Sequence, residues 1–309
     1  MSKVIVAALY QFKPLPKFQD LQHPLKTLCN DLGIKGILLL AEEGINGTVA
    51  GSRAAIDALH RFLLEHFDDL EYKESWAETM PFHRMKVRLK KEIVTLGVPQ
   101  VNPCESVGTY VAPEDWNHLI AEPDVLLIDV RNDYEVKIGT FEGALNPKTQ
   151  NFREFPEFVK TLDKTKHRSI AMCCTGGIRC EKASSYMLSQ GFEEVYHLKG
   201  GILKYIETTP PENSLWYGEC FVFDGRVAVS HNLELGEAKS CYGCRTPLSP
   251  TELQSPFYER GVSCSHCYNL TSPEKKKAAR HRQMQVDLAQ QRGTKHIGAV
   301  RESRASSSI

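Results

Sequence analysis

A cysteine-rich stretch in the middle of the chain, residues 170–183, indicates a strand, a tight turn and a helix in close succession. Its sequence is IAMCCTGGIRCEKA, in which an apolar run ends at Cys173 and Cys174 and helix-forming residues begin near Cys180. A cysteine between the end of a strand and the start of a helix faces backbone N–H groups and the positive end of the helix dipole. We therefore expect Cys174 to carry a thiolate or persulfide anion, with Arg179 adding positive charge at the rim.

The spacing within this loop allows more than one interpretation. Counted from Cys174 it is C-x4-R, and counted from Cys173 it is C-x5-R, the spacing of a cysteine phosphatase loop. A glycine lies three positions after either cysteine, so glycine does not decide between them. A buried structural cysteine pair is the third possibility. Cys180 is either a thiol that resolves an oxidised or persulfidated Cys174 through a disulfide, or a small buried apolar residue.

The sequence on both sides of the loop resembles rhodanese domains. The run LLIDVRN, which contains Asp129 and Arg131, and the following GTFEGALNP are similar to the first rhodanese hallmark, although Thr140 takes the place of its usual histidine. GFEEVYHLKGGI is similar to the closing segment, and short apolar runs between helical patterns indicate a parallel sheet covered by helices. The resemblance implies that Cys174 opens a six-residue loop and takes up a persulfide. The anion cradle would then comprise Thr175, Gly176, Gly177 and Ile178.

Two CxxC pairs follow nearer the C-terminus. Cys241-Tyr-Gly-Cys244 and Cys264-Ser-His-Cys267 are separated by nineteen residues. Four thiolates at this spacing, with no open position, are typical of a structural zinc site. A site that has lost its metal and a pair of redox dithiols are the alternatives.

The first 98 residues alternate between strand and helix patterns. The order indicates a ferredoxin-like, acylphosphatase-like α+β sandwich, with an antiparallel sheet and two helices on one face. Glycines at residues 43–47 are explained by a hairpin turn, although a phosphate-binding loop has a similar composition. Strands are expected at 4–12, 37–40, 48–50, 70–76 and 85–89, and helices at 17–32 and 52–67.

Further along, the chain divides into three more segments. A proline-containing connector leads to a rhodanese-like α/β domain at 113–212, then to a Cys-rich, zinc-ribbon-like module at 213–272 and a basic, flexible tail at 273–309. Together with CTGGIRCEKAS and GECFVFDGRV, this full-length order is similar to the tRNA uridine hydroxylase family. The resemblance implies that the chain hydroxylates carbon 5 of the wobble uridine of tRNA (position 34) to 5-hydroxyuridine. It also implies that the family's essential loop cysteine is Cys174.

The resemblance further implies molecular oxygen as a co-substrate and an electron donor that the sequence does not identify. No GxGxxG motif follows a strand, so no NAD or flavin motif is evident. Residues 274–304 hold nine Lys or Arg against three Asp or Glu, in a chain of zero formal charge, which indicates either a polyanion partner such as tRNA or a solvated tail. Alternate strand residues share a face, so Arg84, Lys86, Arg88 and Lys90 are candidate tRNA contacts or a merely solvated stripe.

Composition places the chain among ordinary soluble proteins, with 41% apolar and 25% charged residues. The start has no apparent secretory signal, and the longest apolar stretch, residues 37–41, is far shorter than the roughly 20 residues that span a bilayer. We expect a cytoplasmic protein that does not associate with membranes, and the sequence indicates no particular protein partner. Ten cysteines in such a protein favour reactive thiols and metal ligands over disulfides.

Two other functions fit the same residues. The chemistry of the loop by itself predicts a thiosulfate or persulfide sulfurtransferase. A non-catalytic protein that binds RNA or docks a sulfur carrier, with the loop as a relic, is the second alternative.

Overall fold

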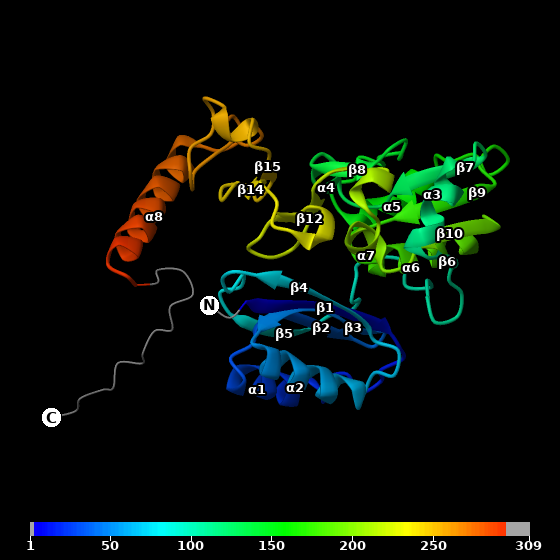
Figure 1. Cartoon of the computed structure of the whole chain (residues 1–309), viewed down its shortest axis with the longest axis horizontal. Helices are drawn as coiled ribbons and strands as arrows, with labels where there is room; N and C mark the ends of the chain where they lie inside the picture. Colours follow the sequence, from blue (N-terminus) through cyan, green and yellow to red (C-terminus); the bar gives the residue numbers. More distant parts are fainter. Residues whose placement is uncertain (1–2, 295–309) are drawn as a thin grey trace. The chain divides into compact units, whose positions relative to one another are not determined.

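The computed structural model describes residues 3–294, and the chain falls into two compact units that meet between residues 239 and 240. The first unit begins with a five-stranded sheet that has two helices on one face (Figure 1). Its strand order is β4-β1-β3-β2-β5. Strands β1 to β4, together with the two helices, form the expected ferredoxin-like sandwich. The sheet is mixed and not antiparallel throughout, because β5 pairs parallel with β2 at its edge. The elements are β1 (Val4–Phe12), α1 (Gln22–Asp31), β2 (Lys35–Ala41), β3 (Gly44–Gly51), α2 (Arg53–Leu64), β4 (Glu71–Ala77) and β5 (Met85–Leu89).

Helix α1 begins later than the sequence pattern indicated. Turns occupy residues 17–21, and the helix starts at Gln22. A start at residue 17 would have placed Pro24 in the helix interior, where its ring and missing N–H break the hydrogen-bond ladder. With the start at Gln22, the proline lies in the first turn, where no backbone donor is needed.

The two faces of this sheet have different neighbours. Ile5, Ala7 and Leu9 of β1 point into the core beneath α1 and α2. Strand residues alternate between faces, so Val6, Ala8 and Tyr10 lie on the face without helices, and all three line the large cavity described below. The fold thus leaves one apolar sheet face available for a site.

The next part of the first unit is the expected parallel sheet with helices on both faces. The strand order is β6-β10-β9-β7. Ile170 and Met172 of β9 pack toward α5 and α6, while Ala171 and Cys173 pack toward α3 and α7. Cys173 is therefore a buried core residue, as predicted. The elements are β6 (Thr109–Val111), α3 (Pro113–Ala121), β7 (Val125–Asp129), α4 (Asp133–Val136), β8 (Gly139–Phe141), a 3-10 turn (Phe152–Glu154), α5 (Phe155–Val159), β9 (Ser169–Cys173), α6 (Ile178–Ser189), β10 (Glu194–Leu198) and α7 (Gly201–Thr208).

The Cys-rich unit begins later than the expected residue 213. Residues 213–239 belong to the first unit, because Trp216, Cys220 and Val229 are buried in the same core as α3 and α7. Strand β11 also pairs with β8. This segment contains 3-10 turns (Pro211–Asn213 and His231–Leu233), β11 (Trp216–Gly218), β12 (Cys220–Phe221) and β13 (Ala228–Val229).

The second unit is small and contains the two CxxC pairs. Its longest element is the helix α8, which lies where a flexible tail was expected. Ser272 stabilises the start of this helix by accepting a hydrogen bond from the Lys275 N–H. The rest of the expected tail, residues 295–309, lies outside the described residues. The elements are β14 (Lys239–Ser240), β15 (Pro247–Leu248), a 3-10 turn (Glu252–Gln254) and α8 (Pro273–Gln291). Within residues 3–294, no helix is both long and apolar enough to cross a bilayer.

A buried lysine of helix α6 connects this helix to the N-terminal sheet through ion pairs. Lys182 is 1% exposed, and its ammonium group lies 2.7 Å from a carboxylate oxygen of Glu43 and 2.6 Å from one of Glu92. It also donates a hydrogen bond to the carbonyl of Val94. One cation therefore neutralises two carboxylates from the hairpin between β2 and β3 and from the connector.

Replacing Lys182 by methionine is expected to lower the free energy of unfolding by about 3 kcal/mol, because both carboxylates lose their partner. Urea denaturation measures this. Lys160→Met is the matched control, since Lys160 and Glu157 form an exposed pair that contributes about 0–1 kcal/mol. Equal stability of the two variants would contradict the assigned role of Lys182.

Candidate active site around Cys174

Cys174 follows the last residue of β9, and its sulfur lies against the start of α6. The Gly177 N–H donates a hydrogen bond to the sulfur at 3.2 Å, and Cys180, in the first turn of α6, lies close enough to lower the pKa of Cys174. The carbonyl of Cys174 accepts a hydrogen bond from the Ile202 N–H at the start of α7, at 2.9 Å. The strand-to-helix position predicted for Cys174 is therefore the one that the structure shows.

The surroundings of Cys174 favour its anionic form. Burial alone would raise the pKa of this thiol, which is 1% exposed. The hydrogen bond from the Cys180 thiol, the charge of Arg179 and the N–H groups of Cys180 and Gly177 outweigh burial and lower the pKa to about 6. Cys173 is different, because burial and the nearby carboxylate of Asp129 raise its pKa well above the usual value. Of the two adjacent cysteines, only Cys174 is suited to act as a thiolate at neutral pH.

Arg179 is buried and fixed by hydrogen bonds, and it does not lie exposed at the rim of the loop. It is 7% exposed, and its guanidinium forms two hydrogen bonds with the Glu135 carboxylate, at 2.7 and 2.8 Å. A third bond goes to the Thr175 hydroxyl at 3.1 Å. Glu135 is fixed in turn, because it accepts the Asn132 N–H in the capping box of α4. The expectation of a rim position was wrong, and Arg179 instead presents a fixed buried charge to the loop.

The rest of the cradle is shaped by glycines. Gly177 has a φ of +104°, and a Cβ there would lie 2.7 Å from the Tyr10 hydroxyl. Gly201 has a φ of +67°, and a Cβ there would lie 2.6 Å from the Cys174 carbonyl oxygen. Side chains at either position would disturb the loop, while Gly176 has open space around it.

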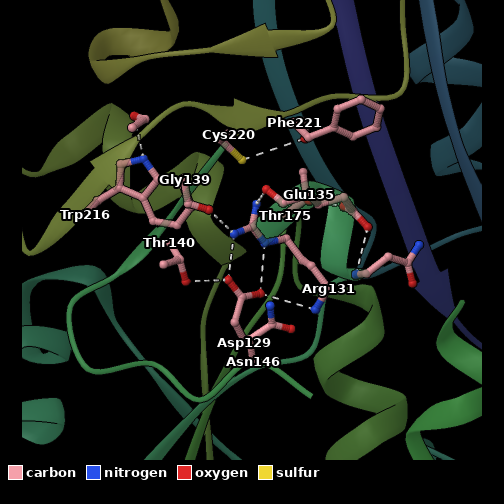
Figure 2. Close-up of polar contacts among 12 residues, drawn as sticks. Asp129, Arg131, Glu135, Gly139, Thr140, Asn146, Thr175, Trp216, Cys220 and Phe221 are labelled. Atoms are coloured by element: carbon pink, nitrogen blue, oxygen red, sulfur yellow. Dashed lines mark hydrogen bonds and ion pairs between the residues drawn. The ribbon is translucent and has the colours of Figure 1, made fainter. Parts of the chain in front are cut away.

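The first-hallmark residues Asp129 and Arg131 form a fully buried pair, and Arg131 also donates to the backbone carbonyl of Glu135 (Figure 2). The Arg131 guanidinium donates to both Asp129 oxygens, at 2.9 and 2.6 Å, and to the Gly139 carbonyl. Thr140, in place of the usual histidine, donates its hydroxyl to Asp129 at 2.9 Å. Neither Asp129 nor Arg131 lines the cavity at Cys174, so this network supports the fold around the site.

A cavity of about 400 Å³ opens beside Cys174, within the usual size range of small-molecule sites. Its walls are the sheet face without helices, the cysteine loop and residues 222–226. Phe223 lines it and is 57% exposed, and Arg226 pairs with Asp224 and donates a hydrogen bond to Ser75 on β4. The residues of the loop that line it are Cys174, Thr175, Gly176, Ile178 and Arg179.

The predicted cationic stripe lies along β5 and on the cavity face of the sheet. Met85 and Val87 pack into the core beneath the helices, so the alternate residues Lys86 and Arg88 point to the other face. Lys86 is paired in register with Ile37 and Arg88 with Leu39, and both of these β2 residues line the cavity. Burial, together with the charges of Arg84 and Arg88, lowers the pKa of Lys86, as expected for cations on one face. Arg84 and Lys90 continue the stripe just beyond the ends of β5.

In the second unit, the four CxxC cysteines form one cluster. The sulfur atoms of Cys241, Cys244, Cys264 and Cys267 all lie within 4.8 Å of one another, which is the arrangement of four ligands around one metal ion. His266 pairs with Glu252 at 2.6 Å and stands apart from the four sulfurs. The cluster could therefore hold a metal through its cysteines alone.

Sequence reasoning missed three residues of the site. Tyr10 lies in an ordinary strand pattern, and only the sheet topology places it beside Cys174. Glu135 and Arg226 belong to segments already noted for their likeness to known families, but their partners are 44 and 151 residues away. Only the role of Glu135 could have been predicted, because it is a carboxylate in the first hallmark and could pair with the arginine of the loop, Arg179.

The comparisons with known proteins cover most of the chain. Residues 4–93 match the UPF0176 acylphosphatase-like domain, and residues 112–208 match the rhodanese-like domain. Two curated relatives are each 57% identical and are both named tRNA uridine(34) hydroxylase. The protein from Rhizobium leguminosarum bv. trifolii aligns over 96% of this chain and 97% of its own length, and that from Rhizobium etli over 96% of both. A solved rhodanese-related protein from Thermoplasma volcanium is 26% identical over 33% of this chain and 95% of its own, with a TM-score of 0.28.

Proposed function

Because this chain belongs to the tRNA uridine(34) hydroxylase family, we propose that it hydroxylates carbon 5 of uridine 34 in tRNA to give 5-hydroxyuridine. The observation that carries the proposal to the site is the low pKa of Cys174 in a cavity lined by an apolar sheet face. That cavity accepts an unstacked pyrimidine, and the Cys174 sulfur that lines it is ionised at neutral pH. Phe223 on its wall is the kind of exposed ring on which an unpaired base stacks.

The chemistry assigned to Cys174 is nucleophilic. C6 of uracil is electron-poor because it is conjugated with the C4 carbonyl, and thiolate addition there moves electron density to C5, the carbon that receives oxygen. Arg179 and the loop N–H groups stabilise the sulfur whenever it is anionic. The balance uses molecular oxygen as co-substrate: one oxygen atom enters the hydroxyl group, and an electron donor supplies two electrons to reduce the other to water.

The cationic stripe on β5 is the proposed contact with the tRNA backbone. Lys86 and Arg88 lie beside the β2 residues that line the cavity, and Arg84 and Lys90 continue the stripe, so phosphates bound there would hold the anticodon loop next to Cys174. Since tRNA is found in the cytoplasm, we also propose that the enzyme acts there.

The cysteine cluster of the second unit is proposed to bind one structural zinc ion. Four sulfur ligands and no open position are the donor set of such sites, and zinc then stabilises a unit with few buried apolar residues.

Elemental analysis is expected to find about one zinc per chain, and Cys241→Ser/Cys264→Ser to lose it. Removal of zinc by a chelator should expose the second unit to protease, since metal binding supplies much of its folding free energy. Cys104→Ser, which alters an exposed cysteine outside the cluster, is the control and keeps its zinc. Zinc retained in the double variant would contradict this assignment.

Mass spectrometry of tRNA nucleosides from cells lacking this protein tests the function. We expect 5-hydroxyuridine and its derivatives to be lost and to return only with the wild-type gene, not with Cys174→Ala. Loss of a thiolated nucleoside, with the oxygen modification intact, would instead identify a sulfurtransferase. Unchanged tRNA, and a Cys174 thiol no more reactive than a free thiol, would favour a non-catalytic protein.

A further inference from the structure

A second buried acid lies next to the site and has no place in the chemistry described so far. Glu181, in the first turn of α6, is 7% exposed. Among the ion pairs of residues 3–294, none includes Glu181, although its neighbour Lys182 binds two carboxylates. A buried carboxylate without a counter-charge is costly for stability, so Glu181 is expected to have a functional role.

Hydrogen bonds connect Glu181 to the cavity on one side. The Tyr10 hydroxyl donates to a Glu181 carboxylate oxygen at 2.6 Å. Tyr10 lines the cavity together with Cys174, and its hydroxyl lies so close to Gly177 that no side chain fits there. The phenol thus lies between the cavity and the buried acid.

On the other side of Glu181 lies a partly exposed tyrosine. Tyr110 is 43% exposed, and its hydroxyl lies close enough to the carboxylate to lower the pKa of Glu181. Tyr10, Glu181 and Tyr110 come from β1, α6 and β6. Glu181 is therefore placed between the Tyr10 hydroxyl at the cavity and a residue that reaches the surface.

We propose that Tyr10 and Glu181 carry the C5 proton of uridine 34 out of the cavity during hydroxylation. This inference rests on the proposed function. Once oxygen is bonded to C5, that carbon holds both a hydroxyl group and a hydrogen. The electron pair of the C5–H bond then re-forms the C5=C6 double bond, the C6–S bond breaks, and its pair returns to Cys174 as thiolate.

The proton released from C5 passes to the Tyr10 oxygen while the proton of Tyr10 moves to Glu181, so that no phenolate forms. Glu181 then loses its proton to solvent on the side of the partly exposed Tyr110. The step consumes no oxidant or reductant. It needs Glu181 to be ionised at the start of each turnover.

The acidity of Glu181 fits this role. Burial raises its pKa to about 7, and the charges of Glu71 and Cys174 act in the same direction, while hydrogen bonds from Tyr10 and Tyr110 oppose them. A base whose pKa is close to the working pH is the most effective proton acceptor. The titratable groups near Glu181 include Tyr10 from β1, Glu71 from β4, Cys104 from the connector, Tyr110 from β6 and Cys174 from the loop. Lys73 of β4 lies over the Tyr10 ring and pairs with Glu71.

The test uses the full-length protein and tRNA that carries tritium at C5 of uridine 34. Wild type is expected to release tritium to water in step with 5-hydroxyuridine formation. Glu181→Gln and Tyr10→Phe should each slow both processes by about 10²-fold or more. The alkylation rate of Cys174 by iodoacetamide and the binding of tRNA should change by less than about threefold, which separates proton transfer from a disturbed fold.

Two further measurements distinguish proton transfer by Glu181 from a purely structural role of this residue. The wild-type rate should rise with pH through about 7, as Glu181 loses its proton, and Glu181→Gln should lose that limb. Formate should restore part of the activity of Glu181→Ala by occupying the vacated space. Glu157→Gln removes an exposed carboxylate that does not line the cavity and serves as the control, with activity close to wild type.

Near-normal hydroxylation by Glu181→Gln, or a pH limb that persists in it, would overturn the proposal. A wild-type protein that forms no 5-hydroxyuridine from tRNA and oxygen, with any electron donor, would overturn the proposed function itself. The two failures are therefore distinguishable.

Discussion

Replacing Cys174 by serine is expected to lower the rate of tRNA hydroxylation by at least about 10³-fold, because a serine hydroxyl is not ionised at neutral pH and is a far weaker nucleophile. The fold should persist, since serine keeps the size of the side chain and its hydrogen bond with the Gly177 N–H. Purified variants are compared by the initial rate of 5-hydroxyuridine formation on unmodified tRNA. Cys104→Ser, at an exposed cysteine, is the control with wild-type activity. Substantial turnover by Cys174→Ser would exclude the thiolate mechanism.

The role of Cys180 can be separated in the same assay. Its thiol lowers the pKa of Cys174, and its own pKa is strongly raised, chiefly because it is buried. A resolving thiol must form a disulfide, whereas a hydrogen-bond donor can be replaced by a hydroxyl group. Cys180→Ser therefore distinguishes the two roles, since a donor role predicts retained activity and a resolving role predicts its loss.

The second large effect is expected at Arg179. Arg179→Met leaves the buried Glu135 carboxylate without its partner and should cost about 3–5 kcal/mol of unfolding free energy. It also removes the charge that favours the Cys174 thiolate, so the thiol pKa should rise from about 6. Since the thiolate is present above the pKa and lost below it, the variant should react slowly with iodoacetamide at pH 7, where the wild type reacts fully.

A double variant separates these two consequences. Arg179→Met/Glu135→Gln removes both charges, and glutamine can still accept the Asn132 N–H in the cap of α4. Most of the lost stability should return, measured by urea denaturation, while the midpoint of alkylation against pH should stay raised. A midpoint near 6 in the double variant would show that Arg179 is not the group that stabilises the sulfur anion.

The parts of the site that sequence predicted well are local in the chain. Cys174, the glycines and Arg179 lie within six residues, and a strand, turn and helix there place N–H groups on the sulfur whatever the rest of the fold does. The fold class was equally accessible, because strand and helix periodicity follows from neighbouring residues.

What sequence did not predict depends on contacts between distant segments. Tyr10 is one apolar strand residue among many until the sheet order places its face against α6. The buried position of Arg179 follows from Glu135, and the late start of the Cys-rich unit follows from Trp216, which packs into a core formed by earlier helices. The shorter α1 shows a local rule that was overlooked, since Pro24 already limited where that helix could begin.

The central claim is that this protein transfers oxygen from O₂ to C5 of uridine 34 by means of Cys174. Incubation of purified protein, unmodified tRNA and an electron donor under ¹⁸O₂, followed by mass spectrometry of the nucleosides, tests it most directly. We predict 5-hydroxyuridine that contains ¹⁸O with wild type and none with Cys174→Ser. Product that contains only oxygen from water, or labelled product formed equally by Cys174→Ser, would contradict the account.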